Sequence, residues 1–288
     1  MIAYGRQFID KDDIKSVVGV LKSDYLTQGP TVKKFEKQIN NLFGSKHSLA
    51  VSNGTSALYL AGKAIGWNKK SHILTSPLTF VAGANVAELL GASVKFIDID
   101  PVSYCIDTYI LEDYLKNSKK KITSVIATDF AGHVCNWKRL KYLSKKYRFT
   151  LINDNCHAVG AEYFGSHKYA AKYADICCLS FHPVKHFTTG EGGAIFTNKS
   201  YLYKKLLAIR EHGILKKKNW WDYNVIEPSL NFRMSELQAS LGVSQIKKIF
   251  KFIKYRRNVA KIYDHEFKNI NIFKIPKKIN CTHSYHLY

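Results

Sequence analysis

Acidic residues are scarce in this sequence, and several patterns that identify other protein classes are missing. The 288 residues include 22 Asp+Glu against 44 Lys+Arg, which gives a formal net charge of +22. No apolar run approaches the roughly 18 residues that a membrane-spanning helix needs. The opening stretch, MIAYGRQFIDKDD, lacks the apolar region of a secretory signal. We therefore expect neither a membrane partner nor a secretory leader.

The cysteines lack the spacing of metal ligands. Six are present, with no CxxC pair and no zinc-type pattern, so we expect no metal centre. Cys177 and Cys178 lie in an apolar stretch and are interpreted as small core residues of a strand. Because no secretory signal is seen, we expect a cytoplasmic, reducing compartment in which the thiols are free.

The surplus of basic residues has three explanations. Nucleic-acid binding requires charge that gathers on one face, often among aromatic residues. The lysines instead occur in short runs spread along the chain, such as 119–121 and 216–218. A solvated, lysine-rich surface is the simplest explanation, and attraction of an anionic, phosphate-bearing metabolite by the field of the whole protein is the third. The charge alone does not decide among them.

Two common nucleotide-binding motifs are also absent. The chain contains neither a Walker A sequence nor a GxGxxG fingerprint, which argues against ATP and NAD as ligands. It shows no internal repeat and no low-complexity linker. Any phosphate site must therefore use a different loop.

The residues that are present predict an α/β fold. Hydrophobic residues make up 46% of the chain, and short Val-, Ile- and Leu-rich runs alternate with helical patterns, as in strands that helices bury on both faces. The expected strands are 48–52, 72–75, 94–99, 124–129, 150–153, 176–180 and 194–197, and the helices between them include 56–65, 81–90 and 137–147. This alternation predicts a mostly parallel central sheet with ligands at the carboxyl ends of its strands.

Two regions depart from this alternation. Near the start, Asp10 is placed to cap a helix whose apolar residues recur at helical spacing, namely Ile14, Val17, Val18 and Leu21. Later, SELQ (235–238) has the form of a capping box that opens a long, lysine-rich helical stretch to about residue 263. The last six residues, HSYHLY (283–288), are interpreted as a strand with no turn or partner after it, as in a truncated chain.

The sequence NGTS (53–56) joins an expected strand to an expected helix. Free N–H groups at a helix N-terminus, a glycine for close approach and two hydroxyl groups together make a phosphate cradle. An ordinary helix cap by Asn53 or Thr55 explains the same residues. Both interpretations stay open on this segment alone.

An acid and a lysine follow two further strands. Asp154 ends one strand, with His157 three residues on, and such an acid can hold a cationic ring nitrogen, bind a metal or serve as a turn residue. Lys185 leaves another strand toward a turn that contains three glycines (190–193). A desolvated lysine there has a lowered pKa and is a usable amine nucleophile, although a surface-loop lysine is the simpler interpretation in so basic a chain. His182 and His186 are interpreted as loop histidines.

Taken together and in their order along the chain, these segments indicate one ligand more specifically than any of them does alone. A phosphate cradle, the aromatic Phe80, the acid Asp154, the amine Lys185 and a glycine-rich turn follow one another along the chain. These groups meet the needs of pyridoxal 5′-phosphate (PLP), which requires a phosphate site, a group against its ring, a carboxylate for the pyridine nitrogen and a lysine. We therefore predict PLP as the cofactor.

At this point the chain resembles the DegT/StrS-type nucleotide-sugar aminotransferases, which have the PLP-dependent transferase fold type I. The resemblance runs from Tyr4 to the last residue. It rests on six segments: LTQG (26–29), NGTSAL (53–58), PLTFVA (77–82), Asp154 with His157 and Ala158, SFHPVKHFTTGEGG (180–193) and NFRM (231–234). It implies a mostly parallel sheet with helices on both faces, plus a partial small α+β domain.

The resemblance implies a role for each matched residue. Lys185 would be the catalytic residue that carries the cofactor, Asp154 would pair with its ring nitrogen, Phe80 would lie against the ring, and His157 near it. The phosphate would be held by Gly54, Thr55, Ser56 and Ser180. Asn231 would reach the cofactor from the neighbouring subunit of a homodimer. The residues implied in substrate binding are Tyr4, Tyr25, Leu26, Thr27, Gln28, Thr55, Ser180 and Asn231.

The resemblance also implies a reaction and a domain division. L-Glutamate would donate an amino group to a UDP-linked 4-keto-6-deoxy-N-acetylhexosamine. PLP-dependent dehydratases related to this family have His where the aminotransferases keep Lys185, so we expect transamination. A sister enzyme acting on a perosamine- or aminoarabinose-type sugar is the alternative, and a non-catalytic basic binding protein is a remote one. The implied divisions are an N-terminal segment (1–12), a large PLP-binding domain (13–240) and the start of a small domain (241–288).

Overall fold

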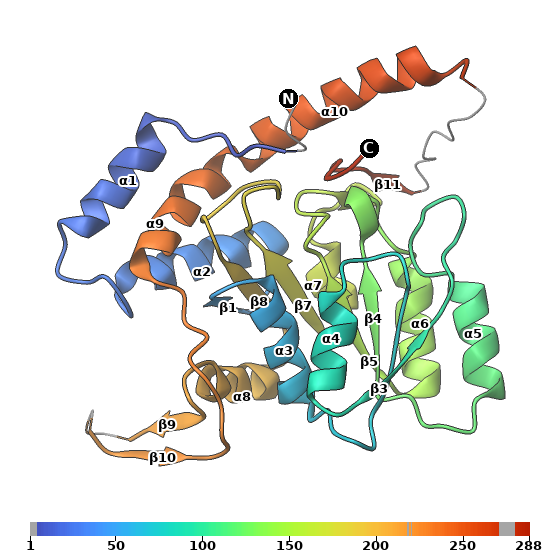
Figure 1. Cartoon of the computed structure of the whole chain (residues 1–288), viewed down its shortest axis with the longest axis horizontal. Coiled ribbons are helices and arrows are strands. Elements are labelled where there is room, and N and C mark those ends of the chain that lie inside the picture. The colour runs from blue at the N-terminus through green and yellow to red at the C-terminus, as the bar shows by residue number, and fades with distance from the viewer. Residues whose placement is uncertain (1–4, 218, 220, 271–279) are drawn as a thin grey trace.

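The computed structural model describes residues 5–217, 219, 221–270 and 280–288 (Figure 1). Its α-helices are α1 (Lys11–Leu21), α2 (Pro30–Phe43), α3 (Gly54–Ile65), α4 (Ala82–Leu89), α5 (Thr108–Asn117), α6 (Trp137–Tyr147), α7 (Tyr169–Tyr173), α8 (Ser200–Arg210), α9 (Glu236–Gln245) and α10 (Ile249–Phe267). Short 3-10 helices are η1 (Phe130–Gly132) and η2 (Ile246–Lys248). The strands are β1 (His47–Val51), β2 (His72–Thr75), β3 (Ser93–Phe96), β4 (Ser124–Thr128), β5 (Thr150–Asp154), β6 (Glu162–Tyr163), β7 (Ile176–Ser180), β8 (Gly193–Thr197), β9 (Ile214–Lys216), β10 (Tyr223–Val225) and β11 (Cys281–Thr282).

A seven-stranded sheet forms the centre of the molecule, in the order β1-β8-β7-β5-β4-β2-β3. β8 runs antiparallel to its neighbours β1 and β7, and the remaining pairs are parallel. The predicted mostly parallel α/β sheet is therefore confirmed. Parallel strands require crossover connections, which the intervening helices provide.

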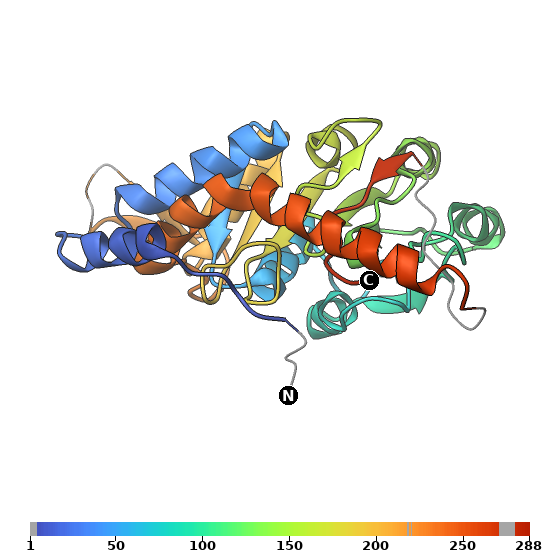
Figure 2. The same ribbon diagram turned by 90° about the horizontal axis from the view of Figure 1, so that it is seen from above.

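Helices cover both faces of this sheet (Figure 1). Side chains alternate between the faces along each strand, so Cys177 belongs to the buried cluster that includes residues of α2, α5, α6 and α7, and Cys178 belongs to the one that includes residues of α3, α4 and α8. The interpretation of this cysteine pair as core residues of a strand is confirmed. Viewed from above, α10 runs across the molecule over one edge of the sheet (Figure 2).

Two expectations about strands are wrong. The edge strand β3 is largely exposed and Phe96 is half-exposed, because β2 alone pairs with this strand in the described sheet. The last six residues do not form a strand. Tyr285 adopts a left-handed backbone (φ 49°), and the N–H groups of Ser284 and Leu287 donate to the carbonyls of Gly132 and Ala131 in η1.

The helix α1 forms as predicted, but its apolar stripe is not buried in this chain. Asp10 caps it in a capping box with Asp13. Ile14 and Leu21 are 57% and 56% exposed, whereas Asp13 is fully buried. The Asp13 carboxylate accepts from Gln245 Nε2 at 2.7 Å and pairs with Lys248 Nζ at 2.8 Å, so polar contacts attach α1 to α9 and η2.

Other expectations concern the capping box and the membrane. Ser235 and Gln238 form the predicted capping box at the start of α9, and the helical stretch continues through η2 into α10. No helix in the described part of the chain combines the length and apolar character needed to cross a membrane. All six cysteines are free thiols.

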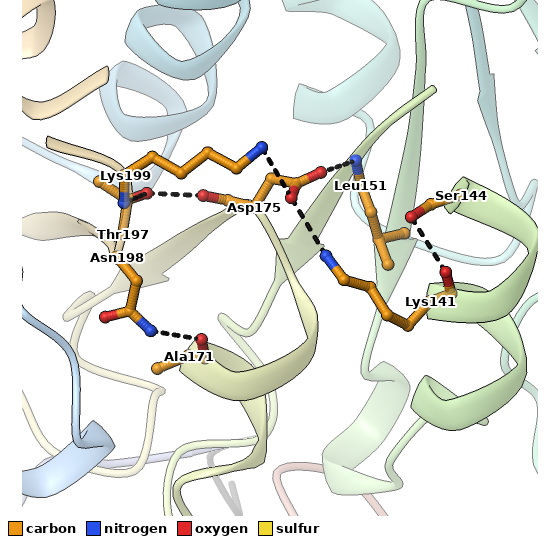
Figure 3. Close-up of polar contacts among 8 residues, drawn as sticks. All are labelled: Lys141, Ser144, Leu151, Ala171, Asp175, Thr197, Asn198 and Lys199. Carbon is orange, nitrogen blue, oxygen red and sulfur yellow. Dashed lines mark hydrogen bonds and ion pairs between the residues drawn. The ribbon is translucent and has the colours of Figure 1, made fainter. Parts of the chain in front are cut away.

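A buried carboxylate ties the strands together at their amino ends (Figure 3). Asp175 precedes β7 and accepts from the Leu151 N–H at 2.9 Å. Its carboxylate also pairs with Lys199 at 3.0 Å and Lys141 at 3.2 Å. Burial by itself raises the pKa of Asp175, but the Leu151 N–H and the two lysines together lower it below the ordinary value of 3.8.

We expect Asp175→Asn to lower the free energy of unfolding by about 2 kcal/mol at pH 7, because charge-assisted hydrogen bonds are lost inside the fold. The lowered pKa means that this contribution is present above pH 3.8 and is lost as the pH falls through the folded-state value. Chemical unfolding at several pH values measures it. The difference between the two proteins should therefore shrink in acid, and a difference that does not change with pH would contradict the assignment.

Candidate active site

The candidate site residues lie where the parallel strands end. β5 ends at Asp154 and β7 ends at Ser180, while β8 begins at Gly193 beside the end of β1. Ser180 pairs in register with Gly193, which in turn pairs with Val51. The loop after β1, the β5 terminus and the Lys185 loop therefore meet at one edge of the sheet, as the sequence predicts.

The N-terminus of α3 forms a cradle of backbone N–H groups. Asn53 caps the helix by accepting from the Ser56 N–H at 2.7 Å, so the capping explanation for this segment is confirmed. The N–H groups of Gly54 and Thr55 make no hydrogen bond within the described residues. They remain available to an anion, which helix N-termini favour. The cap and the cradle thus coexist.

Glycine is required twice beside this cradle. A Cβ at Gly54 would lie 2.8 Å from the Ser180 Cβ, and one at Gly193 would lie 2.4 Å from the Asn53 carbonyl. Without side chains at these positions, the Ser180 hydroxyl approaches the N-terminus of α3. Thr55 is exposed and Ser56 is buried, with its hydroxyl 2.9 Å from that of Ser52.

A second buried carboxylate supports the end of β5. Asp129 accepts from Trp137 Nε1 at 2.9 Å and from Asn155 Nδ2 at 2.9 Å, and its own N–H donates to the Asp154 carbonyl at 3.1 Å. Asp154 is itself buried, and its Oδ1 accepts from the Cys156 N–H at 3.1 Å. The Cys156 N–H thus holds the Asp154 carboxylate, and the Asp129 N–H holds the backbone carbonyl of the same residue.

Lys185 lies half-buried in the loop after β7. Burial lowers the pKa of its amine, while the neighbouring Cys156 and Asp154 side chains act in the opposite direction. Arg256 of α10 donates to the Lys185 carbonyl at 3.3 Å, which fixes the backbone of the loop. A lysine whose pKa is lowered has a larger neutral fraction at neutral pH and can act as a nucleophile or proton acceptor.

Imidazole rings surround this amine. His286 Nε2 lies 3.4 Å from Lys185 Nζ, and the ring of His286 lies 4.3 Å from that of His157, centroid to centroid. Burial, and secondarily the Lys185 charge, lowers the pKa of His157 to about 3. Burial first, then His157 and Lys185, also lowers the pKa of His286. Both rings are therefore neutral at physiological pH, and neither adds positive charge beside the amine.

A cavity of about 730 Å³ opens beside Lys185 and His286. Its walls come from the N-terminal segment, α10 and the end of the chain, and they include Arg6, Lys251 and Arg256. This volume is within the range of small-molecule sites. The local surplus of cations suits an anionic ligand.

The remaining candidate residues lie on the surface. Phe80 lies in the loop after β2 and is 64% exposed. This loop is attached to β4 by a contact of 3.0 Å between the Thr79 and Thr128 hydroxyls. Residues 25–28 are exposed, as is Asn231, whose Oδ1 accepts from the Arg233 N–H at 3.1 Å. Tyr4 lies outside the described residues. The roles of all these residues stay predictions.

The sequence analysis missed His286 and Arg256. His286 is 101 positions from Lys185, inside the segment that we interpreted as a strand. Arg256 is one of many cations in a lysine-rich helix. Only the placement of α10 and of the last residues over the sheet edge identifies them (Figure 2).

Comparison with known proteins assigns the family. The model of the DegT/DnrJ/EryC1/StrS aminotransferase family matches residues 7–288. The chain belongs to this family. A UDP-4-amino-4,6-dideoxy-N-acetyl-beta-L-altrosamine transaminase of Campylobacter jejuni is 40% identical over 289 residues, which span 100% of this chain and 76% of the relative.

Solved structures of aminotransferases share the fold. Helicobacter pylori PseC, described as an aminotransferase involved in the biosynthesis of pseudoaminic acid, matches 99% of this chain and 76% of its own, with a TM-score of 0.88 and 33% identity. The PLP form of the sugar aminotransferase Spr1654 from Streptococcus pneumoniae matches 100% of this chain and 77% of its own, with a TM-score of 0.87 and 25% identity.

The protein is a PLP-dependent aminotransferase, and its own residues fit the cofactor. The α3 cradle presents N–H groups that no other described residue uses and that can bind a phosphate, and the Asp154 carboxylate and Lys185 amine lie close enough to influence each other. The buried Nδ1 of His157 has no partner in the described part of the chain. A polar ligand at this edge of the sheet would supply one, because buried polar atoms are rarely left unpaired.

Proposed function

We propose that this enzyme transfers the amino group of L-glutamate to the C4 keto group of a UDP-linked 2-acetamido-2,6-dideoxy-4-hexulose. The product would be UDP-4-amino-4,6-dideoxy-N-acetyl-β-L-altrosamine, in pseudaminic acid biosynthesis. The observation that carries this proposal is the 40% identity, along the whole chain, to a transaminase of that name. The partly buried Lys185 beside Asp154 and an anion cradle is the site that such a reaction needs.

Each residue at the sheet edge has a proposed part in holding the cofactor. When bound, PLP supplies an electron sink for carbanion chemistry at the amino-bearing carbon. Thr55, Ser56 and Ser180 would hold its phosphate, together with the Gly54 N–H. The buried Asp154 carboxylate would keep the ring nitrogen protonated, because an opposite charge nearby favours the charged form.

Lys185 would move the proton that transamination requires. Its neutral Nζ would accept the proton from the α-carbon of the donor and would give that proton up, within the same half-reaction, to the cofactor carbon that takes the amino group. When the His286 proton is on Nδ1, Nε2 accepts a hydrogen bond from Lys185 Nζ and orients the amine. Phe80 would lie against the ring, and His157 beside it would help to exclude water.

The nucleotide sugar would bind in part through a second subunit. We propose a homodimer in which Asn231 reaches the neighbouring site, while Tyr4 and residues 25–28 contact the sugar nucleotide. The β9–β10 hairpin, which projects from the body of the molecule in Figure 1, exposes Tyr223, Val225 and Ile226. Exposed apolar side chains gathered in this way are typical of protein interfaces and support the dimer.

A second candidate is a sister activity on a different nucleotide sugar. A GDP-perosamine synthase of Vibrio cholerae is 30% identical over 289 residues, and the chemistry at Lys185 would be the same. In either case we propose that the enzyme is cytoplasmic. We also propose that the chain is divided into an N-terminal segment (1–12), a large cofactor domain (13–240) and a small-domain portion (241–288). The positively charged side chains of the cavity would attract the diphosphate group of any nucleotide sugar, so they do not indicate which base the substrate carries.

An assay with a panel of UDP-, GDP- and dTDP-linked 4-keto sugars tests the proposal. With L-glutamate as donor, we expect the UDP-linked N-acetylhexosulose to have the highest kcat/KM. 2-Oxoglutarate should form in equal amount to the amino sugar. Preference for a GDP-linked sugar would favour the perosamine-type activity, and no turnover of any sugar would overturn the proposal.

A further inference from the structure

Glu236 makes a set of contacts that the reaction at Lys185 does not use. It is the first residue of α9 and is 1% exposed. Its carboxylate accepts three backbone N–H groups at the start of α2: Gly29 at 3.0 Å, Thr31 at 2.7 Å and Val32 at 3.0 Å. Its own N–H donates to the Leu26 carbonyl at 3.0 Å. We refer to these four contacts as the Glu236 clamp.

The clamp replaces a cap that α2 lacks. The N-cap residue of α2 is Gly29, which has no side chain to accept the first N–H groups of the helix. The negative charge of Glu236 instead lies at the N-termini of both α2 and α9, where helix dipoles stabilise an anion. Within the described residues, no lysine or arginine pairs with Glu236. Its stabilisation therefore comes from the backbone of the segment that it holds.

The segment between the two ends of the clamp is the exposed stretch at residues 25–28. Gln28 has φ 55°, a left-handed backbone that a side-chain-bearing residue adopts at a cost. Such a conformation persists only when neighbouring contacts hold it. Glu236 provides them on both sides, through the Leu26 carbonyl before Gln28 and the Gly29 N–H after it. A β-bridge between Thr27 and Ser235 adds a third attachment.

The residues just before Glu236 contact the end of β1, beside the proposed cofactor site. Just before Glu236, the Phe232 carbonyl accepts from the Ser52 N–H at 2.9 Å, and Arg233 forms a β-bridge with Val51. The residues from Phe232 to Glu236 thus connect the end of β1, which leads to the α3 cradle, with the segment at 25–28. A shift of Glu236 would move that segment relative to the cradle.

We propose that Glu236 is a positioning residue for the nucleotide sugar. It holds residues 25–28 in the shape and place in which they contact the sugar nucleotide, while cofactor binding and the glutamate half-reaction do not depend on it. This inference rests on the proposed function, because residues 25–28 matter only when a nucleotide sugar is the acceptor. If Glu236 only stabilised the fold, its replacement would not change the KM of the nucleotide sugar more than the KM of L-glutamate.

Glu236→Gln is the first test, because both carboxylate oxygens accept N–H groups. An amide keeps only one oxygen, so in either orientation its NH₂ group faces at least one N–H donor. We expect the KM for the UDP-4-keto sugar to rise about tenfold, while kcat and the KM for L-glutamate change less than about twofold. Glu88→Gln, an exposed change on α4, is the matched control. An unchanged sugar KM, or equal rises in both KM values, overturns the proposal.

Gly29→Ala is the second variant, and it keeps the Glu236 charge should Glu236→Gln fail to fold. An added Cβ would lie 2.6 Å from the Tyr25 Cβ and 3.0 Å from the Glu236 carboxylate, so the segment must shift. The φ of −96° at Gly29 suits alanine, and no backbone strain is introduced. The same selective rise in sugar KM is expected. Gly19→Ala, with open space around the new methyl group, is the control.

Hydrogen exchange separates failure of the clamp from failure of the proposed function. In the PLP-bound enzyme, Glu236→Gln should speed amide exchange at Gly29, Thr31 and Val32 without any substrate. If wild type does not aminate the UDP-4-keto sugar, the proposed function fails, and the KM comparison moves to the panel sugar that it does aminate. Unchanged exchange at these amides overturns the clamp whichever sugar is used.

Discussion

Lys185→Ala is expected to lower kcat for transamination by about 10⁴-fold, because the variant loses the amine that would carry the cofactor and move the proton. That factor corresponds to about 5 kcal/mol of lost transition-state stabilisation. The variant should also lose the visible absorption band that a lysine-linked cofactor gives to the wild type. Steady-state kinetics and an absorption spectrum of the PLP-loaded protein measure the two effects.

The expected fall in kcat for Lys185→Ala comes from removal of the amine and not from unfolding of the protein. Methyl replacement leaves the Lys185 N–H to His182 bond and the Arg256 contact to its carbonyl intact, since both use the backbone. We therefore expect the unfolding midpoint of the cofactor-free protein to change little. Lys204→Ala, an exposed change on α8, should keep both the band and the activity. A Lys185→Ala variant that retains the band or full turnover would contradict the assignment.

Most of the sheet could be predicted because its strands follow simple local rules. β2 and β7 have the predicted bounds, since an apolar run ends in each case at a polar or turn-forming sequence. β3 was predicted as buried because its composition matches that of the central strands. Its exposure depends on its position at the edge of the sheet, and strand order is a property of the whole chain.

The candidate site was predictable only in part, for a related reason. Lys185, Asp154 and the α3 cradle each follow a strand, so the rule about carboxyl ends brings them together. His286, Arg256 and Glu236 reach the site through contacts between distant segments, and their local sequences carry no signal for it. The last six residues are not the strand that we expected, because their backbone groups bind the distant segments η1 and α10, which the local sequence does not reveal.

Asp154→Asn is expected to lower kcat by on the order of 10³-fold, or about 4 kcal/mol. A neutral amide cannot hold a protonated ring nitrogen as a carboxylate does, so the cofactor would lose much of its power to withdraw electrons. We also expect PLP to bind about tenfold more weakly. Kinetics with saturating PLP and a titration of the cofactor-free protein separate the two effects.

The substitution is chosen to leave the turn after β5 in place. Asparagine still offers an oxygen to the Cys156 N–H, and the bond from the Asp129 N–H to the residue-154 carbonyl is unaffected. If Asp154 were only a turn residue, Asp154→Asn would keep kcat and change stability alone. Asp113→Asn on α5 removes a charge far from the sheet edge and should change neither kcat nor PLP affinity. A tenfold or smaller loss of kcat at saturating PLP would therefore exclude a ring-nitrogen partner at this position, because the lost charge would then have acted on binding and not on the chemistry.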